Sequence, residues 1–290
     1  MLHIRRQSHY QILQREQRTA EKALLYLNLI HEVRRTHPSM GLRTIYEKAM
    51  PEGIGRDAFI DLGAHYGYIL EPLRSKTRTT HPHPSALYPN LLADKKFTDV
   101  NQIWTSDITY YAIGESWYYL TFIMDVYSRR IIGYTAADNM RASNNVAALN
   151  MALDLRQVTD YAGQLIHHSD RGAQYVSEVY VELLQSRNVH ISMCQNVLEN
   201  AHIERVNGII KNKYLRYWRI ESLRQLKSKL KKAVDAYNYD KPHQSLQGKS
   251  PVDFENFIKE LPLKERYNLD IFTYNQNSEQ KDPNQLVLEF

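Results

Sequence analysis

The sequence lacks the features that hold small secreted proteins together. Its only cysteine is Cys194, which excludes both an intrachain disulfide framework and a thiolate-rich zinc site. The apolar runs, of which Leu24–Leu27 is typical, are too short to span a membrane. The N-terminal residues Met1–Arg6 are not followed by an apolar stretch of the length found in signal peptides. These absences exclude the secreted, membrane and collagen-like classes. We therefore expect a soluble, cytoplasmic protein without a membrane partner.

Charge is unevenly distributed along the chain, although the net charge is only +5. Residues 1–100 carry a net charge of +5, residues 101–200 carry −4, residues 201–251 carry +8 and residues 252–290 carry −4. An acidic centre between basic segments suits a metal-binding site beside a surface for a polyanion such as nucleic acid. The alternative is that the lysine-rich helices are simply solvated.

The chain length of 290 residues predicts about two domains, since a domain averages roughly 150 residues. The first predicted domain covers residues 1–71 and is helical, with helices in residues 20–48 and over Arg56–His65. The apolar residues at helical spacing in the first stretch are Leu24, Leu25, Leu27, Ile30 and Val33. Helices joined by glycine-containing turns are compatible with a helix-turn-helix that binds DNA, or with a domain that only packs.

A basic, proline-rich linker is predicted over residues 72–98, a second domain over residues 99–258 and a loosely attached tail over residues 259–290. In the second domain, strands are predicted at 103–111, 117–124, 130–135, 165–168 and 189–193, and helices at 143–157, 177–186, 200–218 and 222–238. This order predicts an α/β fold with a ribonuclease-H-like mixed five-stranded sheet flanked by helices.

Three carboxylates stand at positions where they need a physical explanation. Asp107 lies inside the first strand, Asp170 follows the short fourth strand, and Glu204 lies in the first turns of the long helix. Aspartate is disfavoured in strands and costly to bury unpaired, but a divalent cation would hold three converging carboxylates together. Each also has a simpler explanation: Asp107 could pair with an arginine such as Arg171, Asp170 could begin a turn with Gly172, and Glu204 could favour the helix dipole.

The long helix adds groups that suit nucleic acid. Glu204, Gly208 and Lys211 share one face, which offers a carboxylate, a bare backbone position and a lysine for phosphate. Beyond them, basic residues alternate with aromatic ones, as phosphate contacts and base stacking would require. These residues are Lys213, Arg216, Arg219, Tyr214, Tyr217 and Trp218. The alternative is that the aromatic side chains belong to the core.

Five ordered segments carry a resemblance to a known family: Trp104–Tyr110, Phe122–Gly133, His168–Tyr175, Glu199–Glu204 and Pro242–Pro251. The chain resembles the DDE transposases with a retroviral-integrase-like catalytic core, specifically the second-reading-frame (OrfB) proteins of bacterial insertion sequences. The resemblance covers about residues 20–258. Between Asp170 and Glu204 there are 33 residues, slightly fewer than is usual in that family, and the shortening falls in the loop Cys194–Leu198.

The resemblance implies that Asp107, Asp170 and Glu204 are the catalytic residues and bind two Mg²⁺ ions, with Mn²⁺ as a substitute. It implies that Lys211 contacts terminal DNA, and we expect Lys213, Arg216 and Arg56 to bind DNA as well. Outside this set, Asp125 is interpreted as a turn residue, His168 as a strand-end histidine, and Glu199 as the rival for the third acid.

The activity that the resemblance implies is that of a DNA transposase. Water would attack the phosphodiester at the element end, and the freed 3′ hydroxyl would join target DNA by transesterification. The implied partners are DNA, further copies of the chain in a multimer and an upstream-frame fusion partner, in the bacterial cytoplasm at the nucleoid. The alternatives are a metal-dependent nuclease without strand transfer and a catalytically silent DNA-binding regulator.

Overall fold

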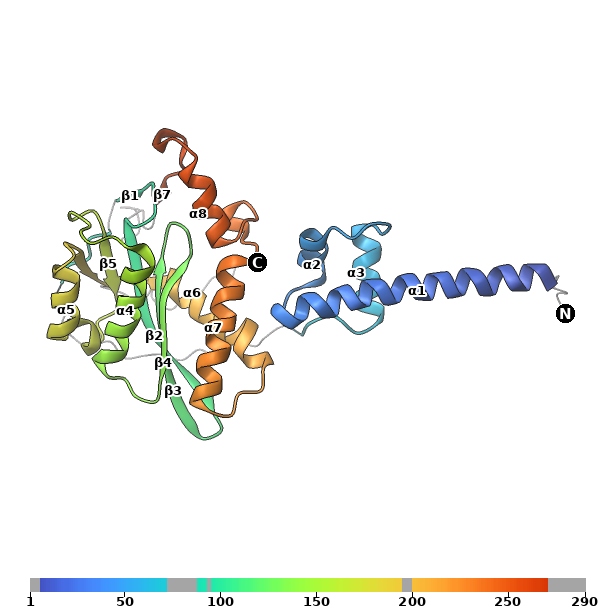
Figure 1. The fold of residues 1–290 in the computed structure, drawn as a ribbon, viewed down its shortest axis with the longest axis horizontal. Coiled ribbons are helices and arrows are strands. Elements are labelled where there is room, and N and C mark those ends of the chain that lie inside the picture. The colour runs from blue at the N-terminus through green and yellow to red at the C-terminus, as the bar shows by residue number, and fades with distance from the viewer. Residues whose placement is uncertain (1–5, 72–87, 93–94, 195–199, 271–290) are drawn as a thin grey trace, which may run out of the picture. The chain divides into compact units, whose positions relative to one another are not determined.

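The computed structural model describes residues 6–71, 88–92, 95–194 and 200–270 (Figure 1). The described chain divides into two compact units. The first contains the described residues of Met1–Thr80, Tyr110–Tyr118 and Arg205–Asp253, and the second those of His81–Thr109, Tyr119–Glu204 and Phe254–Phe290. The domain boundaries predicted at residues 72 and 99 stay a prediction, and residues 72–87 of the predicted linker lie outside the described residues.

A mixed five-stranded sheet forms the framework of the second unit, although residues 110–118, at the hairpin end of two of its strands, are grouped with the first unit. Its strands are β2 (Ile103–Ile113), β3 (Ser116–Asp125), β4 (Ile131–Ala137), β5 (Ile166–Ser169) and β6 (His190–Met193). Their order in the sheet is β4-β3-β2-β5-β6, in which β3 and β4 pair antiparallel while β5 pairs parallel with both β2 and β6. This topology confirms the predicted ribonuclease-H-like α/β fold, and the strand ends lie within two residues of the predicted ones.

Helices α4 (Ala142–Arg156) and α5 (Glu178–Gln185) pack on each other, α4 against β4 and α5 against β6. Gly133 in β4 permits the close approach of α4, because a Cβ atom there would lie 2.1 Å from the carbonyl oxygen of Ala148. The apolar core of this unit includes Trp104, Ile123, Leu149, Leu165, Tyr175 and Tyr180, all of them buried.

A buried cluster of charged residues, called the Glu255 network below, holds helix α8 (Pro251–Lys259) on this unit. Glu255 accepts hydrogen bonds from Arg130 Nη1 at 2.5 Å, Arg156 Nη2 at 2.6 Å and Ser128 Oγ at 2.8 Å. Arg156 also pairs with Asp125 at 3.1 Å. Asp125 accepts a hydrogen bond from the Ser128 backbone N–H in the following turn, which agrees with its interpretation as a turn residue. The burial of Asp125 and its ion pair with Arg156 were not predicted.

A small two-stranded sheet was also not predicted. Strand β1 (Lys96–Phe97) pairs antiparallel with β7 (Leu269–Asp270), so two residues of the segment predicted to be a loose tail belong to a sheet. Within residues 6–71, 88–92, 95–194 and 200–270, no helix has the length and apolar character needed to cross a membrane.

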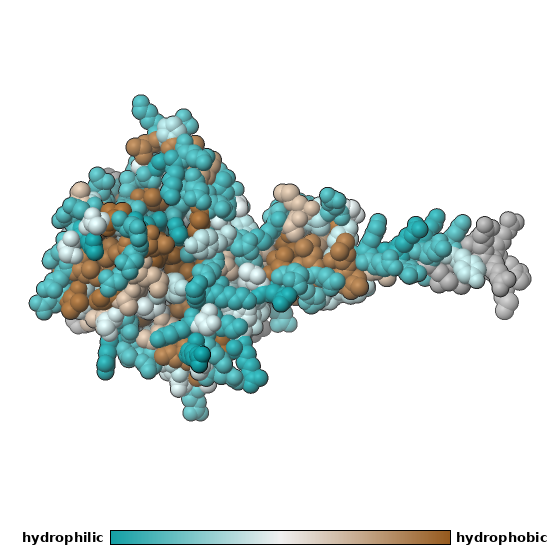
Figure 2. All heavy atoms as spheres, viewed as in Figure 1, coloured by the Kyte–Doolittle hydropathy of each residue, from teal (hydrophilic) through white to brown (hydrophobic). Residues whose placement is uncertain are grey.

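Three helices form the N-terminal part of the first unit: α1 (Arg6–Thr36), α2 (Leu42–Ala49) and α3 (Arg56–His65). The bounds of α3 are those predicted, whereas α1 begins earlier than predicted. Tyr26, Ile30 and Phe59 are buried in the core of these helices, but Leu24 and Leu25 are 59% and 65% exposed. Figure 2 accordingly shows hydrophobic surface over this helical segment. The apolar spacing was therefore correct for a helix, but only Ile30, Leu27 and Val33 of the five residues pack on its core.

The segment predicted as one long helix over 200–218 changes its winding part-way. Helix α6 (Ala201–Ile209) is followed by a π-helical turn at Ile210–Tyr214 and a 3₁₀ turn at Leu215–Tyr217. Two tertiary contacts are made in this stretch: the carbonyl oxygen of Leu215 accepts a hydrogen bond from the Tyr111 hydroxyl, and the Tyr214 hydroxyl lies 2.9 Å from His37 Nδ1. A π turn is wider than an α turn and rotates the residues that follow it, so the predicted helical face does not extend unchanged beyond residue 210.

Helix α7 (Leu223–Tyr239) completes the first unit and ends beside the N-terminal helices. His37 lies buried between Tyr214 and Asp240: its Nδ1 is 2.9 Å from the Tyr214 hydroxyl and its Nε2 is 2.6 Å from an Asp240 carboxylate oxygen. Lys48 of α2 also pairs with Asp240. These contacts join residues that are about 200 positions apart in the sequence.

Candidate active site

Asp107 in β2 and Asp170, the first residue after β5, each follow one member of a residue pair on neighbouring parallel strands. In the pairing of β2 with β5, Ser106 stands opposite Ser169, and each aspartate is the next residue along its chain. Parallel strands run about 4.8 Å apart, so the two positions are direct neighbours near the C-terminal end of β5. The structure thus brings together two of the three predicted acids.

Tyr175 lies beside both of these aspartates. Its hydroxyl is 2.9 Å from the Ser106 hydroxyl, and the side chain is buried. Burial raises the pKa of Tyr175 well above its ordinary value, and the negative charges of Asp170 and Asp107 raise that pKa further. The sequence prediction did not include Tyr175, although it lies within one of the five motifs.

Asp170 begins a tight turn, as the simpler explanation for this residue supposed. Its Oδ1 accepts a hydrogen bond from the Gly172 backbone at 3.0 Å. A Cβ atom at Gly172 would lie 3.0 Å from the same oxygen, so a side chain there would crowd the carboxylate. Partial burial raises the pKa of Asp170 while the Gly172 hydrogen bond opposes the rise. The turn leaves the second carboxylate oxygen for another ligand.

Glu204 lies in the first turn of α6, and two contacts fix the position of that turn. Asn200 donates a hydrogen bond from Nδ2 to the carbonyl oxygen of Ser106 at 3.3 Å, which ties the start of the helix to the strand of Asp107. Arg129 Nη1 lies 2.5 Å from His202 Nδ1. Burial raises the pKa of Glu204, although the side chain remains accessible to solvent. Neither Arg129 nor Asn200 was predicted, because their partners are distant in the sequence.

The carboxylates are not gathered into a metal cluster in the structure. In the part of the chain that it describes, no three His, Cys, Asp or Glu side chains lie close enough together to hold a metal ion. The roles of Asp107, Asp170 and Glu204 as catalytic residues and metal ligands therefore stay a prediction. Glu199, the rival third acid, lies outside the described residues.

His168 occupies a closed environment inside β5. Its Nδ1 is 2.9 Å from Ser192 Oγ and its Nε2 is 3.1 Å from Cys194 Sγ. Burial lowers the pKa of His168 to about 4, so the imidazole is neutral at pH 7. These contacts agree with the interpretation of His168 as a strand histidine.

The predicted DNA-binding residues lie in two segments of the first unit, the end of the long helical run and the start of α3. Lys211 and Lys213 belong to the π-helical turn, where Lys211 Nζ lies 3.4 Å from the Tyr110 carbonyl oxygen, and Arg216 is exposed in the 3₁₀ turn that follows. Arg56 is exposed at the start of α3 and pairs with Asp57 at 2.8 Å.

The aromatic residues near these cations divide between core and surface. Tyr214 is buried, whereas Tyr217 is 40% exposed. The ammonium groups of Lys229 and Lys232 lie 5.6 and 5.2 Å from the centre of a Trp218 ring, so cations occupy that ring. Tyr217 is thus the aromatic residue of the three that is best placed to stack on a base.

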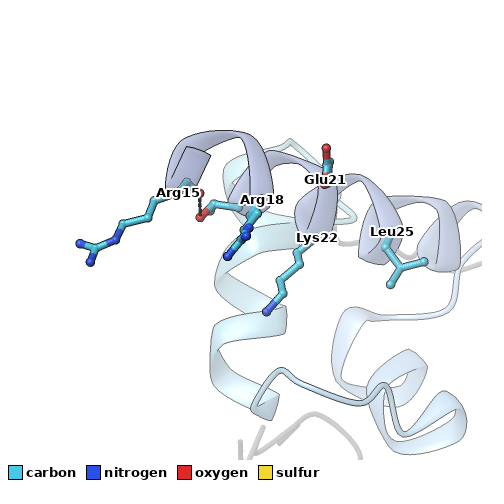
Figure 3. A pocket seen from close by; sticks show the side chains of 6 residues that line it. Arg15, Arg18, Glu21, Lys22 and Leu25 are labelled. Atoms are coloured by element: carbon cyan, nitrogen blue, oxygen red, sulfur yellow. Dashed lines mark hydrogen bonds between the residues drawn. The ribbon is translucent and has the colours of Figure 1, made fainter. Parts of the chain in front are cut away.

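A surface hollow along α1 contains none of the predicted site residues. It is lined by Arg15, Arg18, Thr19, Glu21, Lys22 and Leu25 (Figure 3). Among the described residues, all six lining side chains come from this one helix. The hollow therefore lacks the convergent polar groups of a catalytic site.

Comparison with known proteins gives the family. Two models of the integrase core domain match the chain, one over residues 98–197 and the other over residues 188–251. The "Insertion element IS600 uncharacterized 31 kDa protein" of Shigella sonnei is 32% identical over 263 residues, covering 87% of this chain and 94% of that protein. The chain belongs to the OrfB-type transposases of insertion sequences. It is therefore a transposase with an integrase core, an enzyme of the polynucleotidyl transferase class.

The transposase is also similar to more distant proteins. The "Putative transposase for insertion sequence element IS986/IS6110" of Mycobacterium tuberculosis (strain ATCC 25177 / H37Ra) is 30% identical over 188 residues, covering 61% of this chain and 66% of that protein. Among solved structures, the HTLV-2 integrase catalytic core domain in complex with magnesium is 22% identical with a TM-score of 0.43, covering 53% of this chain and 95% of that one.

Proposed function

We propose that this transposase cleaves DNA at the ends of its element and joins the freed ends to target DNA, with Asp107, Asp170 and Glu204 as catalytic residues. The observation that carries the proposal is that Asp107 and Asp170 directly follow Ser106 and Ser169, which are paired on neighbouring parallel strands. The hydrogen bond from Asn200 to Ser106 supports the inclusion of Glu204, because it ties the helix of the third acid to the strand of the first.

The donor set fits Mg²⁺. All three side chains are carboxylates, and hard divalent cations prefer oxygen ligands. The pKa of Asp170 and that of Glu204 are both raised by burial, so each carboxylate would gain from a nearby positive charge. When bound, a pair of Mg²⁺ ions, or Mn²⁺ in their place, would stabilise the attacking and leaving oxygens of a displacement at phosphorus.

The chemistry balances without a covalent enzyme intermediate. In the first step, water attacks the phosphorus at the element end and the P–O3′ bond breaks, which leaves a 3′ hydroxyl and a 5′ phosphate. In the second step, that hydroxyl attacks a phosphodiester of the target. One P–O bond forms as another breaks, so no energy source is consumed. None of the three acids is a nucleophile in this scheme; their contribution is to hold the metal ions and orient the reacting phosphate.

The DNA partner is assigned to the first unit. Lys211, Lys213 and Arg216 would contact phosphates, which give affinity without sequence information. Residues 1–71 would read the element ends through Arg56 and α3, as in a helix-turn-helix. We include in the proposal a homo-multimer that holds both ends, an upstream-frame fusion partner and a place at the bacterial nucleoid.

The catalytic test uses three charge-removing variants. Asp107→Asn, Asp170→Asn and Glu204→Gln should each abolish cleavage and strand transfer while DNA affinity is retained or increased, because each loses a ligand charge with little change of shape. Asp154→Asn, at an exposed position of α4, is the matched control and should be fully active. The assays are cleavage of an element-end duplex and joining of a pre-cleaved duplex, both in Mg²⁺.

Two outcomes would overturn parts of the proposal. If Glu204→Gln kept near-normal turnover and Glu199→Gln lost it, Glu199 would be the third acid. If the wild type cleaved element ends but did not join pre-cleaved ends to a target, it would be a nuclease and not a strand-transfer enzyme.

A further inference from the structure

Ser106, the residue before Asp107 in β2, contacts two segments that are distant in the sequence. The residue is fully buried, so its hydroxyl group needs a partner inside the protein. The hydroxyl lies 2.9 Å from the Tyr175 hydroxyl, and the Ser106 carbonyl oxygen accepts a hydrogen bond from Asn200 Nδ2 at 3.3 Å. The two partners stand 69 and 94 positions later in the chain.

Tyr175 belongs to the turn that holds Asp170. Its backbone N–H donates to the carbonyl oxygen of Gly172 at 3.0 Å, and the Gly172 N–H donates to Asp170 Oδ1, also at 3.0 Å. The ring of Tyr175 lies against the same glycine, because a Cβ atom on Gly172 would be 3.4 Å from Tyr175 Cδ2. Two hydrogen bonds therefore connect the Asp170 carboxylate to Tyr175, whose hydroxyl contacts Ser106.

Asn200 makes the connection to the third acid. It is 4% exposed and stands directly before α6, four residues before Glu204, which is about one helical turn. Its hydrogen bond to Ser106 fixes the start of this helix on β2. We call Ser106, Tyr175 and Asn200 the Ser106 junction. The junction thus contacts the chain beside Asp107, the turn of Asp170 and the start of the helix that carries Glu204.

We propose that the Ser106 junction sets the relative positions of the three acids, with Ser106 and Tyr175 as positioning residues that fix the distance between Asp107 and Asp170. This inference rests on the proposed function, since it takes the three acids to be metal ligands. A divalent cation binds its oxygen ligands at narrowly defined distances. Residues that orient the ligands therefore contribute to metal affinity without touching the metal. The two hydroxyls are uncharged, so they act on the geometry of the site.

The first test measures Mn²⁺ binding to the full chain without DNA, through the electron paramagnetic resonance signal of free Mn²⁺. Ser106→Ala and Tyr175→Phe should each raise the Kd for Mn²⁺ about tenfold, the lower end of the range for residues that orient metal ligands. The double variant should bind about as weakly as either single variant. The two effects should not multiply, because both changes break the same hydrogen bond.

The second test separates a positioning role from a contact with the reacting phosphate. In cleavage of an element-end duplex, Tyr175→Phe should need about tenfold more Mg²⁺ for half of its maximal rate. Its rate at saturating Mg²⁺ should stay close to that of the wild type, because the metal ions then hold the carboxylates in place. A hydroxyl that contacted the phosphate in the transition state would lower the rate at every Mg²⁺ concentration.

Tyr127→Phe is the matched control for a general loss of packing. Tyr127 is also a fully buried tyrosine of the second unit, and its hydroxyl donates to the carbonyl oxygen of Tyr267 at 3.1 Å. Tyr127→Phe and Tyr175→Phe each lose one buried hydrogen bond, so both should unfold at a lower urea concentration than the wild type. Of the two, Tyr175→Phe alone should bind Mn²⁺ more weakly.

The proposal is overturned if Ser106→Ala and Tyr175→Phe bind Mn²⁺ as tightly as the wild type, or if their effects multiply in the double variant. It is also overturned if Tyr127→Phe weakens Mn²⁺ binding to the same extent. If Ser106→Ala does not fold, Tyr175→Phe and its control decide the question alone.

Asp107→Asn distinguishes a failure of this inference from a failure of the proposed function. If Asp107→Asn binds Mn²⁺ as tightly as the wild type, the proposed metal site is wrong and the inference fails with it. If Asp107→Asn binds Mn²⁺ weakly while Ser106→Ala and Tyr175→Phe bind it normally, the metal site stands and only the inference fails.

Discussion

Removing the charge of Glu255 should unfold the second unit far more readily than removing a surface charge. Glu255 is 2% exposed and is the carboxylate that pairs with both Arg130 and Arg156. Although desolvation opposes it, the hydrogen bond and charge of Arg156 and the charge of Arg130 lower the pKa of Glu255, so the group is ionised at pH 7. Glu255→Gln keeps the shape and removes the carboxylate charge that the guanidinium groups of Arg130 and Arg156 share.

The magnitude follows from the cost of an uncompensated buried charge. Breaking a buried ion pair by removing one partner costs about 3–5 kcal/mol. At about 2–4 °C per kcal/mol for a unit of this size, the melting temperature of the second unit should fall by roughly 6–20 °C. Asp154→Asn is the control, because this carboxylate is exposed on α4 of the same unit, and a surface substitution usually changes stability by at most about 0.5 kcal/mol.

The assay needs a signal from the second unit alone, since the two units can unfold separately. Trp104 lies in the core of that unit, whereas Trp117 and Trp218, the other two tryptophans, belong to the first. Urea unfolding is therefore followed by the fluorescence of Trp104 in a Trp117→Phe, Trp218→Phe background. The double variant Glu255→Gln, Arg130→Met should recover part of the loss, because it restores the charge balance. A loss below about 1 kcal/mol for Glu255→Gln would refute this account of the network.

Two further changes have expected outcomes. Gly133→Ala should destabilise the second unit by about 1–3 kcal/mol, because the new Cβ would meet the Ala148 carbonyl of α4. Gly208→Ala should be neutral or stabilising, because nothing lies within 4 Å of its new Cβ. Equal effects of the two substitutions in urea unfolding would contradict the packing argument. Burial lowers the pKa of His37 in the folded protein, so stability that is present above its unfolded pKa of about 6.5 should be lost as the pH falls below that value. The urea midpoint reported by Trp218 should therefore drop between pH 7 and 5 in the wild type and not in His37→Gln. A wild-type midpoint that does not change with pH would contradict this.

The parts of the fold that the sequence predicted well are those with strong local signals. The strands β2 and β3 are rich in β-branched and aromatic residues and meet at a glycine turn, so their positions follow from short-range pattern alone. The two-residue strands β1 and β7 have no such pattern, because two residues cannot show a period. Their pairing depends on residues that are distant in the chain.

The features that prediction missed are long-range pairings of side chains. Asp125 could be placed at a turn, but its partner Arg156 is 31 residues away. The helix after Glu204 was predicted to continue to residue 218, whereas its winding changes at Ile210, in a stretch where Tyr214 and Leu215 contact side chains that are distant in the sequence. The three acids were predicted from motif order, and the structure adds to them the neighbouring strand positions of Asp107 and Asp170.

The Glu255 network also sets the order in which this chain becomes stable during its synthesis. Arg156 leaves the ribosome 99 residues before Glu255, an interval of roughly 5–20 s at ordinary rates of translation. All five strands of the sheet are already synthesised by then, since β6 ends at Met193. A nascent core without α8 would hold Arg130 and Arg156 against a single carboxylate. This unit thus reaches its final stability only after α8 has been synthesised. A chain that stops before residue 251 should therefore be degraded by proteases faster than the full chain.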